Sequence, residues 1–165
     1  DIGVANDFRR IGLVRNPTNF GTTTVASADT RRQLFAAIFS SVSGTFTADE
    51  EINQASTGAV GKVVEFDSTN KILYFYQTRF PDCGTDSNGN LTAFSGANAI
   101  TGQSSSASAT PDTSNSTTTN GTVFVSGYSN PELAFDSGDM IYVEERSPIT
   151  RASDQTENIK LIIEF

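Results

Sequence analysis

The chain has 165 residues, 19 acidic and 11 basic side chains, one cysteine and no histidine. The net charge of −8 makes phosphate backbones and anionic membrane surfaces poor partners, and no apolar run is long enough to span a membrane. Without histidine there is no Ser-His-Asp triad and no imidazole metal site, and one cysteine cannot form an intrachain disulfide.

The composition favours strands and turns over helices. Twelve Phe and four Tyr occur without Trp, beside abundant Thr, Ser, Gly and Asn. We therefore expect an all-β fold, an antiparallel β-sandwich-like domain that takes in the whole chain, residues 1–165. The chain begins at Asp1 without Met and carries no signal-peptide pattern, which indicates a fragment of a longer protein or a processed product.

The first predicted element is a short strand over residues 8–14, FRRIGLV, which ends at the Asn16-Pro17 turn. Residues 29–42, DTRRQLFAAIFSSV, are ambiguous: their apolar residues recur at helical spacing, and Asp29 could cap a helix. The same run also fits a strand buried on both faces. We favour the strand, because a β-rich sheet would offer it partners.

Residues 44–77 predict a β-hairpin preceded by a strand. In the first arm Val64 and Phe66 share one face and Val63 takes the other, while the second arm, residues 71–77, is apolar on both sides. Between the arms, residues 67–70 read Asp-Ser-Thr-Asn, side chains that bond nearby backbone and stabilise turns.

Residues 95–121, SGANAITGQSSSASATPDTSNSTTTNG, form a different kind of sequence with almost nothing to bury. Such a composition does not offset its own ordering entropy. We therefore predict a long protruding Ser/Thr-rich loop, a finger with few contacts to the core that orders against a partner or a neighbouring copy.

Three more strands are predicted at residues 122–128, 139–146 and 158–165. The last carries its apolar residues on one face and should be anchored in a core. We expect one set of side chains from the hairpin and these strands to be buried together: Phe66, Leu73, Phe75, Val143, Leu161 and Ile163.

The patterns that could carry catalysis or bind a metal are weak. Asp136, in Phe-Asp-Ser-Gly, resembles the aspartic protease signature, but one copy would require a homodimer and a turn is the better interpretation. Cys83 has no histidine to activate it. Residues 56–62 lack the first glycine of a phosphate loop, and the possible calcium ligands lack the required glycine and terminal Glu: Asp82, Asp86, Asn88 and Asn90. We predict no catalytic residue, cofactor or metal.

The arginines suggest protein contacts instead, since a guanidinium clamps carboxylates or carbonyls across an interface. Five arginines near strand ends and turns are the candidate interface residues: Arg9, Arg10, Arg79, Arg146 and Arg151. Local surface pairing is an equally good interpretation. A glycan-binding β-sandwich on a viral or cell surface is the alternative function, with Tyr74, Tyr76 and Tyr128 as groove aromatics.

Three stretches carry a family resemblance: residues 6–18, NDFRRIGLVRNPT, residues 40–80, and residues 137–165 with the Glu145-Arg146 turn and the Asp154-Gln155-Thr156-Glu157 run. They resemble the C-terminal part of the baseplate wedge protein family, gene product eight, of T-even-type contractile-tailed bacteriophages. The resemblance implies a non-enzymatic, mostly β virion protein of the tail baseplate that is assembled in the bacterial host cytoplasm. It also implies fingers that reach neighbouring baseplate or tail proteins, and a possible homodimer.

Overall fold

A computed structural model describes residues 10–27, 32–77, 90–134 and 137–145. Every regular element in these ranges is a strand, and all strand pairs are antiparallel. The all-β, antiparallel, sandwich-like prediction is confirmed. The contacts within the chain group it into two compact units, residues 17–137 and residues 1–16 with 138–165. The single domain over residues 1–165 stays a prediction.

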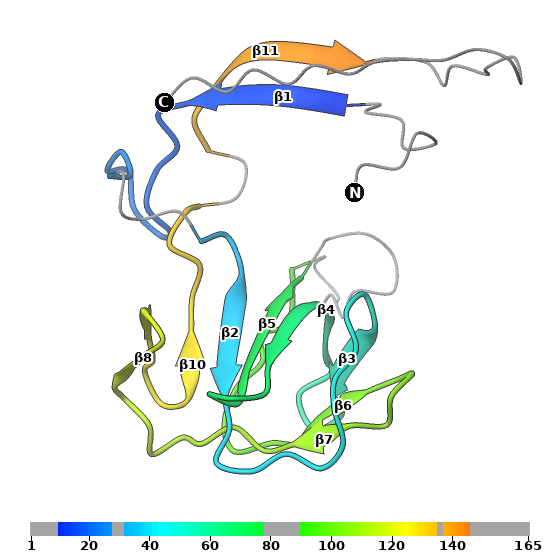
Figure 1. Ribbon diagram of the computed structural model, residues 1–165. Helices are drawn as coiled ribbons and strands as arrows, with labels where there is room; N and C mark the ends of the chain where they lie inside the picture. Colours follow the sequence, from blue (N-terminus) through cyan, green and yellow to red (C-terminus); the bar gives the residue numbers. More distant parts are fainter. Residues whose placement is uncertain (1–9, 28–31, 78–89, 135–136, 146–165) are drawn as a thin grey trace, which may run out of the picture. The chain divides into compact units, whose positions relative to one another are not determined.

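The larger unit is built on a seven-stranded sheet of order β10-β2-β5-β4-β3-β6-β7 (Figure 1). A small separate hairpin, β8 with β9, lies between β7 and β10 in the sequence. The strands are β2 (Phe35–Ile38), β3 (Glu51–Gln54), β4 (Ala59–Asp67), β5 (Ile72–Tyr76), β6 (Ile100–Gly102), β7 (Ser108–Ala109), β8 (Thr118–Thr119), β9 (Thr122–Val123) and β10 (Tyr128–Ser129).

The predicted hairpin is present as β4 and β5, with β3 before it. Its turn is fixed by Asp67, whose Oδ1 accepts the N–H groups of Thr69 (2.9 Å) and Asn70 (3.0 Å). The face assignment in β4 was wrong, because a β-bulge follows Val63 and shifts the register against β5. Val63 is fully buried while Val64 is 40% exposed, so the alternation that the sequence predicted is broken there.

The ambiguous run around residues 29–42 contains strand β2, as predicted, within the part that the structure describes. β2 lies between β10 and β5, and Ala36, Ala37 and Ile38 are buried. Burial on both faces of a central strand explains why the run is continuously apolar and why its periodicity resembled a helix.

Two apolar clusters lie on opposite faces of β2 and β5. The main cluster contains Ala37, Phe39, Phe46, Ile52, Ala59, Val63, Leu73, Phe75, Phe94, Ile100, Ala107 and Ala109. The second contains Ala36, Ile38, Ile72 and Phe124, with Tyr74 packed against it. Phe75 is at the centre of the first cluster, edge to face with Phe94 at 4.7 Å between ring centroids.

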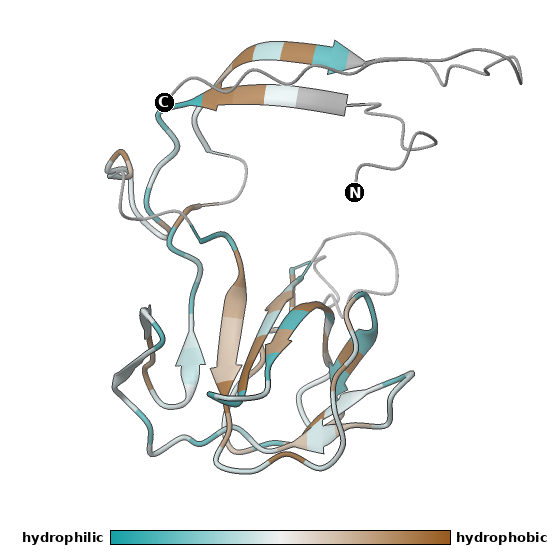
Figure 2. Cartoon of the chain, viewed as in Figure 1, coloured by the Kyte–Doolittle hydropathy of each residue, from teal (hydrophilic) through white to brown (hydrophobic). Residues whose placement is uncertain are grey.

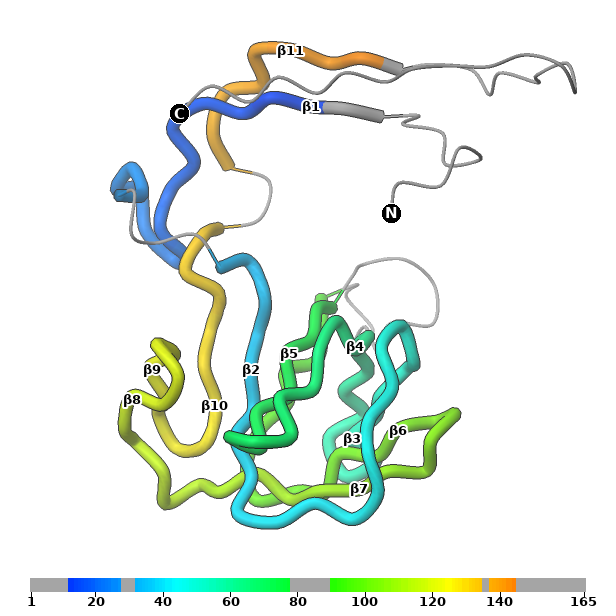
Figure 3. Tube along the Cα trace, viewed as in Figure 1, coloured from blue at the N-terminus to red at the C-terminus, as the bar shows by residue number. Residues whose placement is uncertain are grey.

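Residues 95–121 do not form a finger with few core contacts, so that prediction was wrong for most of the segment. They supply β6 and β7, and Ile100, Ala107 and Ala109 belong to the main core cluster. The chain then passes along the end of β2 (Figure 3): Ser43 and Ser108 exchange two backbone hydrogen bonds of 2.9 Å, and Asp112 N–H donates to Ile38 O. The segment therefore joins the two ends of the sheet. Residues 116–118, beyond this seam, are exposed.

A buried carboxylate fixes the turn between β6 and β7. Glu50 is 5% exposed, and its two oxygens accept the N–H groups of Thr47 (2.6 Å), Ser104 (3.1 Å) and Ser105 (2.9 Å) and the hydroxyl of Ser105 (2.8 Å). Burial acts to raise the pKa of Glu50, but the hydrogen bonds from Ser105, Thr47 and Ser104 together outweigh it and hold the pKa below the ordinary value of 4.5. Two serines of this polar segment, Ser104 and Ser105, therefore donate hydrogen bonds to the Glu50 carboxylate, which directly precedes β3.

A buried amide holds the start of the same segment. Gln54 is fully buried; its Oε1 accepts Ser95 N–H (2.9 Å), and its Nε2 donates to Asn98 O (2.8 Å) and to the hydroxyl of Tyr128 (3.1 Å). The Tyr128 hydroxyl donates to Gly96 O at 2.7 Å. These bonds satisfy the backbone of a polar segment that has few apolar side chains to anchor it.

The single strand predicted at residues 122–128 is two strands around a tight turn. Val125 and Tyr128 exchange backbone hydrogen bonds across Ser126 and Gly127, both with positive φ. Gly127 has no room for a side chain, since a Cβ there would lie 2.6 Å from Asp112 O. The chain therefore reverses here instead of continuing as one strand.

The smaller unit contains a two-stranded ribbon, β1 (Arg10–Arg15) with β11 (Asp139–Glu145), which matches the strands predicted at residues 8–14 and 139–146. None of its described side chains belongs to the two core clusters. Val143 is 63% exposed, so its predicted burial with Leu73 and Phe75 was wrong, whereas both of those residues are buried as predicted and Phe66 packs against their cluster. Leu161, Ile163 and the predicted strand at residues 158–165 lie outside the described residues.

Candidate interaction surfaces

The β1–β11 ribbon carries most of the exposed large apolar side chains of the described chain. Figure 2 shows hydrophobic segments, in brown, in both strands. Six of the ten exposed large hydrophobic residues belong to it: Leu13 (53%), Val14 (47%), Met140 (60%), Ile141 (57%), Tyr142 (47%) and Val143 (63%). A soluble monomer rarely exposes so many apolar side chains in one short element.

The strand register assigns these side chains to two faces. Opposed residues share a face, so Leu13 lies with Tyr142, and Val14 with Met140 on the other side. The register slips between these two pairs, so that Ile141 has no partner and forms a bulge. The bulge brings Met140 to the face of Gly12 and Val143, where a Cβ on Gly12 would lie 3.3 Å from the Met140 sulfur.

We call Val14, Met140 and Val143 the apolar face of the ribbon. The opposite face is amphipathic: it pairs Leu13 and Tyr142 with the exposed Arg15–Asp139 ion pair of 3.3 Å and a bond from the Tyr142 hydroxyl to Glu144. With side chains 63% and 69% exposed, that ion pair contributes under about 1 kcal/mol. The two faces therefore differ in chemistry although they share the same strands.

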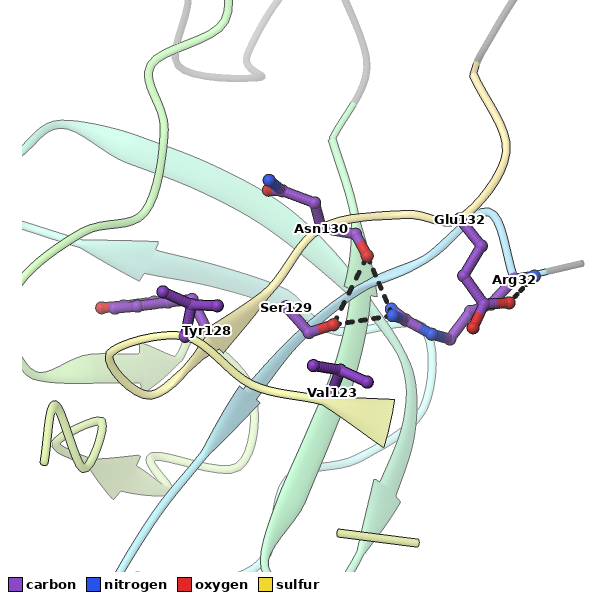
Figure 4. Close-up of a pocket in the computed structure, with 7 residues that line it drawn as sticks. Arg32, Val123, Tyr128, Ser129, Asn130 and Glu132 are labelled. Atoms are coloured by element: carbon purple, nitrogen blue, oxygen red, sulfur yellow. Dashed lines mark hydrogen bonds between the residues drawn. The ribbon is translucent and has the colours of Figure 1, made fainter. Parts of the chain in front are cut away.

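A second candidate surface is a pocket of about 440 Å³ in the larger unit, beside β10 (Figure 4). Its lining residues are Arg32, Val123, Val125, Tyr128, Ser129, Asn130 and Glu132. The Arg32 guanidinium donates to Leu34 O, to Ser129 Oγ at 2.7 Å and to Asn130 O at 2.9 Å. Burial lowers the pKa of Arg32, and the nearby Glu132 carboxylate acts against that shift.

Arg32 was not among the predicted interface residues. The sequence shows only two adjacent arginines, Arg31 and Arg32, at the start of an apolar run. The acceptors lie about a hundred residues later, at Ser129 and Asn130, and come close only because β10 pairs with β2. The local sequence around Arg32 carries no sign of them.

The structure leaves the predicted interface arginines undecided. Arg9, Arg79, Arg146 and Arg151 lie outside the described residues, and only the backbone of Arg10 is placed, opposite Glu145. All five stay predictions.

The other predicted site residues are placed only in part. Asp136, Cys83 and the possible calcium ligands Asp82, Asp86 and Asn88 also lie outside the described ranges. Beside Asp136, Ser137 Oγ donates to Ala134 O and accepts Thr18 N–H, and Gly138 has a φ of 88°, which fits the turn interpretation of that sequence. Within the described residues no three His, Cys, Asp or Glu side chains gather as metal ligands.

Two of the three tyrosines proposed for glycan binding, Tyr74 and Tyr128, make internal contacts. The Tyr74 hydroxyl bonds Thr122 Oγ1 at 3.1 Å, and its ring packs against the second core cluster. Tyr128 is bonded to Gln54 and Gly96, and burial raises its pKa. Neither Tyr74 nor Tyr76 lines the Arg32 pocket. Tyr128 does line that pocket, and the glycan-binding alternative stays a prediction.

Comparison with known proteins finds a family match. The sequence model of a family described as Bacteriophage T4, Gp8 matches residues 82–165, about half of the chain, including β11 of the ribbon and the pocket residues from Val123 to Glu132. No curated protein and no solved structure matches. The described residues contain no helix that is both long and apolar enough to cross a membrane.

Proposed function

The chain belongs to the bacteriophage T4 Gp8 family, and from this membership we infer that it is a structural protein of the phage tail baseplate. We propose that it holds neighbouring baseplate or tail proteins in register through protein contacts and catalyses no reaction. Its place is the virion, after assembly in the cytoplasm of the bacterial host. A net charge of −8 argues against nucleic acid and membranes as partners.

The observation that supports this proposal is the apolar face of the ribbon. Val14, Met140 and Val143 lie exposed on one side of two paired strands, with Gly12 opposite Val143 on the same side. Fully burying a side chain of this kind stabilises a complex by about 1.5 to 3 kcal/mol. A partner that covers this face therefore gains several kcal/mol before the cost of association is subtracted.

The ribbon is also an element that benefits from a partner. A two-stranded sheet by itself is marginally stable in water, and an unpaired strand edge is a place where another strand can add. Among the described strands, β1 and β11 pair only with each other. We propose that a neighbouring baseplate protein packs on the apolar face, and a second copy of this chain is one form that neighbour can take.

The five candidate arginines belong to the same proposal. Arg10 begins β1 and pairs with Glu145, the last residue of β11, and Arg146 is the next residue in the sequence. We propose that Arg9, Arg10, Arg79, Arg146 and Arg151 bond carboxylates or carbonyls of neighbouring proteins, in the bidentate manner that favours Arg over Lys.

The experiment compares two double variants that differ in which face they change. Met140→Ser with Val143→Ser removes the apolar face, while Leu13→Ser with Tyr142→Ser changes the opposite face of the same ribbon. Since all four side chains are about half or more exposed, both variants should retain the parent's circular dichroism. We expect the first to lose about 3 kcal/mol of binding, roughly a hundredfold in affinity, in a pull-down of other baseplate proteins.

The control variant should bind within about threefold of the parent, because it leaves the apolar face unchanged. Equal binding by the parent and the Met140→Ser, Val143→Ser variant would refute the apolar face as the contact. Any hydrolase activity of the purified parent would count against the structural role itself.

A further inference from the structure

The pocket around Arg32 has the chemistry of a second contact site. We propose that it receives a segment of a neighbouring protein in which an acidic side chain lies next to an aliphatic one, with the carboxylate on Arg32 and the aliphatic group on Val123 and Val125. This rests on the proposed function, since it names the chemistry of one partner of a baseplate protein.

The guanidinium is fixed in place but has binding capacity left. Within the described ranges it donates to three oxygens, those of Leu34, Ser129 and Asn130, and none of these three is charged. A guanidinium has five N–H donors, so two have no partner among the described residues. A carboxylate that meets a preoriented guanidinium loses little conformational entropy on binding, which makes this a favourable anchor.

The apolar part of the pocket is equally well fixed. In the chain from Thr122 to Val125, Thr122 and Phe124 are buried while Val123 and Val125 are 61% and 69% exposed. Phe124 inserts into the second core cluster, and Thr122 bonds the Tyr74 hydroxyl. This alternation holds the side chains of both valines outward at the pocket. Exposed there, they gain none of the stabilisation that burial of an apolar side chain gives.

Glu132 sets the strength of the site. Its Oε2 accepts the Arg32 backbone N–H at 2.8 Å, and its negative charge lies close enough to Arg32 to influence that group's pKa. An incoming carboxylate is attracted by Arg32 and repelled by Glu132. The site should therefore bind weakly as a single contact, which suits one of several contacts in a large assembly.

The test uses the whole chain and two short probes. N-acetyl-leucyl-glutamate methylamide supplies the proposed acid and aliphatic group, and the glutamine analogue removes only the charge. Binding is followed by the NMR shifts of the Arg32 side-chain N–H and the methyl groups of Val123 and Val125. The acidic probe should shift all three saturably, and the glutamine probe should bind at least about tenfold more weakly.

Three variants are predicted to change probe affinity in different directions, and a nonspecific effect would not reproduce that pattern. Val123→Ser with Val125→Ser should weaken the acidic probe without unfolding the chain, because both side chains are exposed. Glu132→Gln keeps an oxygen for the Arg32 N–H and removes the repulsion, so it should tighten the acidic probe and leave the glutamine probe unchanged. Arg32→Gln should abolish the preference for the acidic probe.

The proposal is overturned if the acidic and glutamine probes bind alike, if Glu132→Gln weakens the acidic probe, or if inorganic phosphate binds as well and the valine variant has no effect. The last outcome would leave a plain anion site. These results are independent of the pull-down with the ribbon variants. If the probes fail to bind as predicted while the ribbon variants lose binding as predicted, only the pocket proposal is refuted. If the probes bind as predicted and the ribbon variants keep full binding, only the apolar-face contact is refuted.

Discussion

The buried Glu50 carboxylate gives a sharp prediction about how the Ser/Thr-rich segment folds. In Glu50→Ala the backbone N–H groups of Thr47, Ser104 and Ser105 lose their acceptor at once. Each buried donor left without a partner costs about 1 to 3 kcal/mol, and water entering the space returns part of it, so we expect a loss of about 3 to 5 kcal/mol. That is a large fraction of the stability of a domain of this size.

Glu50→Gln is the more conservative change and tests the charge. One oxygen remains to accept hydrogen bonds from the four donors. The amide NH₂ faces N–H and O–H groups and cannot accept from them, so we expect a loss of about 2 to 3 kcal/mol of stability. Glu51→Gln, at the next and exposed position, is the matched control and should change stability by less than about 0.5 kcal/mol. Urea unfolding followed by circular dichroism measures all three variants.

The Glu50 effect should also depend on pH with a definite sign. Because the folded-state pKa lies below the ordinary value of 4.5, the ionised carboxylate stabilises the fold fully above that value, and the stabilisation is lost as the pH falls through the folded-state pKa. The gap between the parent and Glu50→Gln should therefore be constant near neutral pH and narrow in acid. A Glu50→Ala variant within about 1 kcal/mol of the parent, or a gap that widens in acid, would refute the account.

Three further changes test the core and the turns, all by urea unfolding. Phe75→Ala should cost about 3 to 5 kcal/mol, because the ring is 1% exposed and packs on Phe94; a cost under about 1 kcal/mol would contradict its central place. Gly127→Ala should cost about 2 to 3 kcal/mol of stability, since the new Cβ would meet Asp112 O. Gly121→Ala is the control, also at positive φ but in open space, and should cost only about 1 kcal/mol. Equal costs would refute the close approach of Gly127 to the Asp112 backbone. Tyr128→Phe should cost about 1 to 2 kcal/mol by removing the hydroxyl from Gln54 and Gly96, and an unchanged stability would mean that water replaces it.

The sequence predicted well where the determinants are local. The β4–β5 hairpin follows from alternation on either side of an Asp-Ser-Thr-Asn turn, and the Asp67 hydrogen bonds are those that such a turn favours. Strand β2 was harder, because a strand buried on both faces has no alternation of period two, and the expected β partners decided it.

The Ser/Thr-rich segment was misjudged because its determinants are distant in sequence. Ile100, Ala107 and Ala109 suffice to join it to the core only because Glu50 and Gln54 satisfy its backbone from positions 41 to 55 residues earlier. The composition of a segment gives its number of apolar residues, but not the hydrogen-bond acceptors that residues elsewhere in the chain supply to its backbone.

The sequence predicted which residue types would form the candidate sites, but not which positions would form them. Arginines were expected at interfaces, yet Arg32 becomes a site only when β10 brings Ser129 and Asn130 to it. Val143 was expected in the core because it lies in a strongly apolar strand, and it is exposed because β11 pairs only with β1 among the described strands. A strand's apolar pattern predicts that something will cover it, and does not say whether the cover is its own chain or another protein.

The central claim, that the apolar face of the β1–β11 ribbon meets another protein in the assembled baseplate, is tested most directly by photo-crosslinking within assembled phage particles. A photoreactive phenylalanine analogue would replace Met140 on the apolar face or, as the control, Tyr142 on the opposite face, and mass spectrometry would identify the cross-linked peptides. The account predicts that position 140 cross-links to a neighbouring baseplate protein or a second copy of this chain, with a much lower yield from position 142. Particles in which position 140 gives no intermolecular product, while position 142 does, would contradict it.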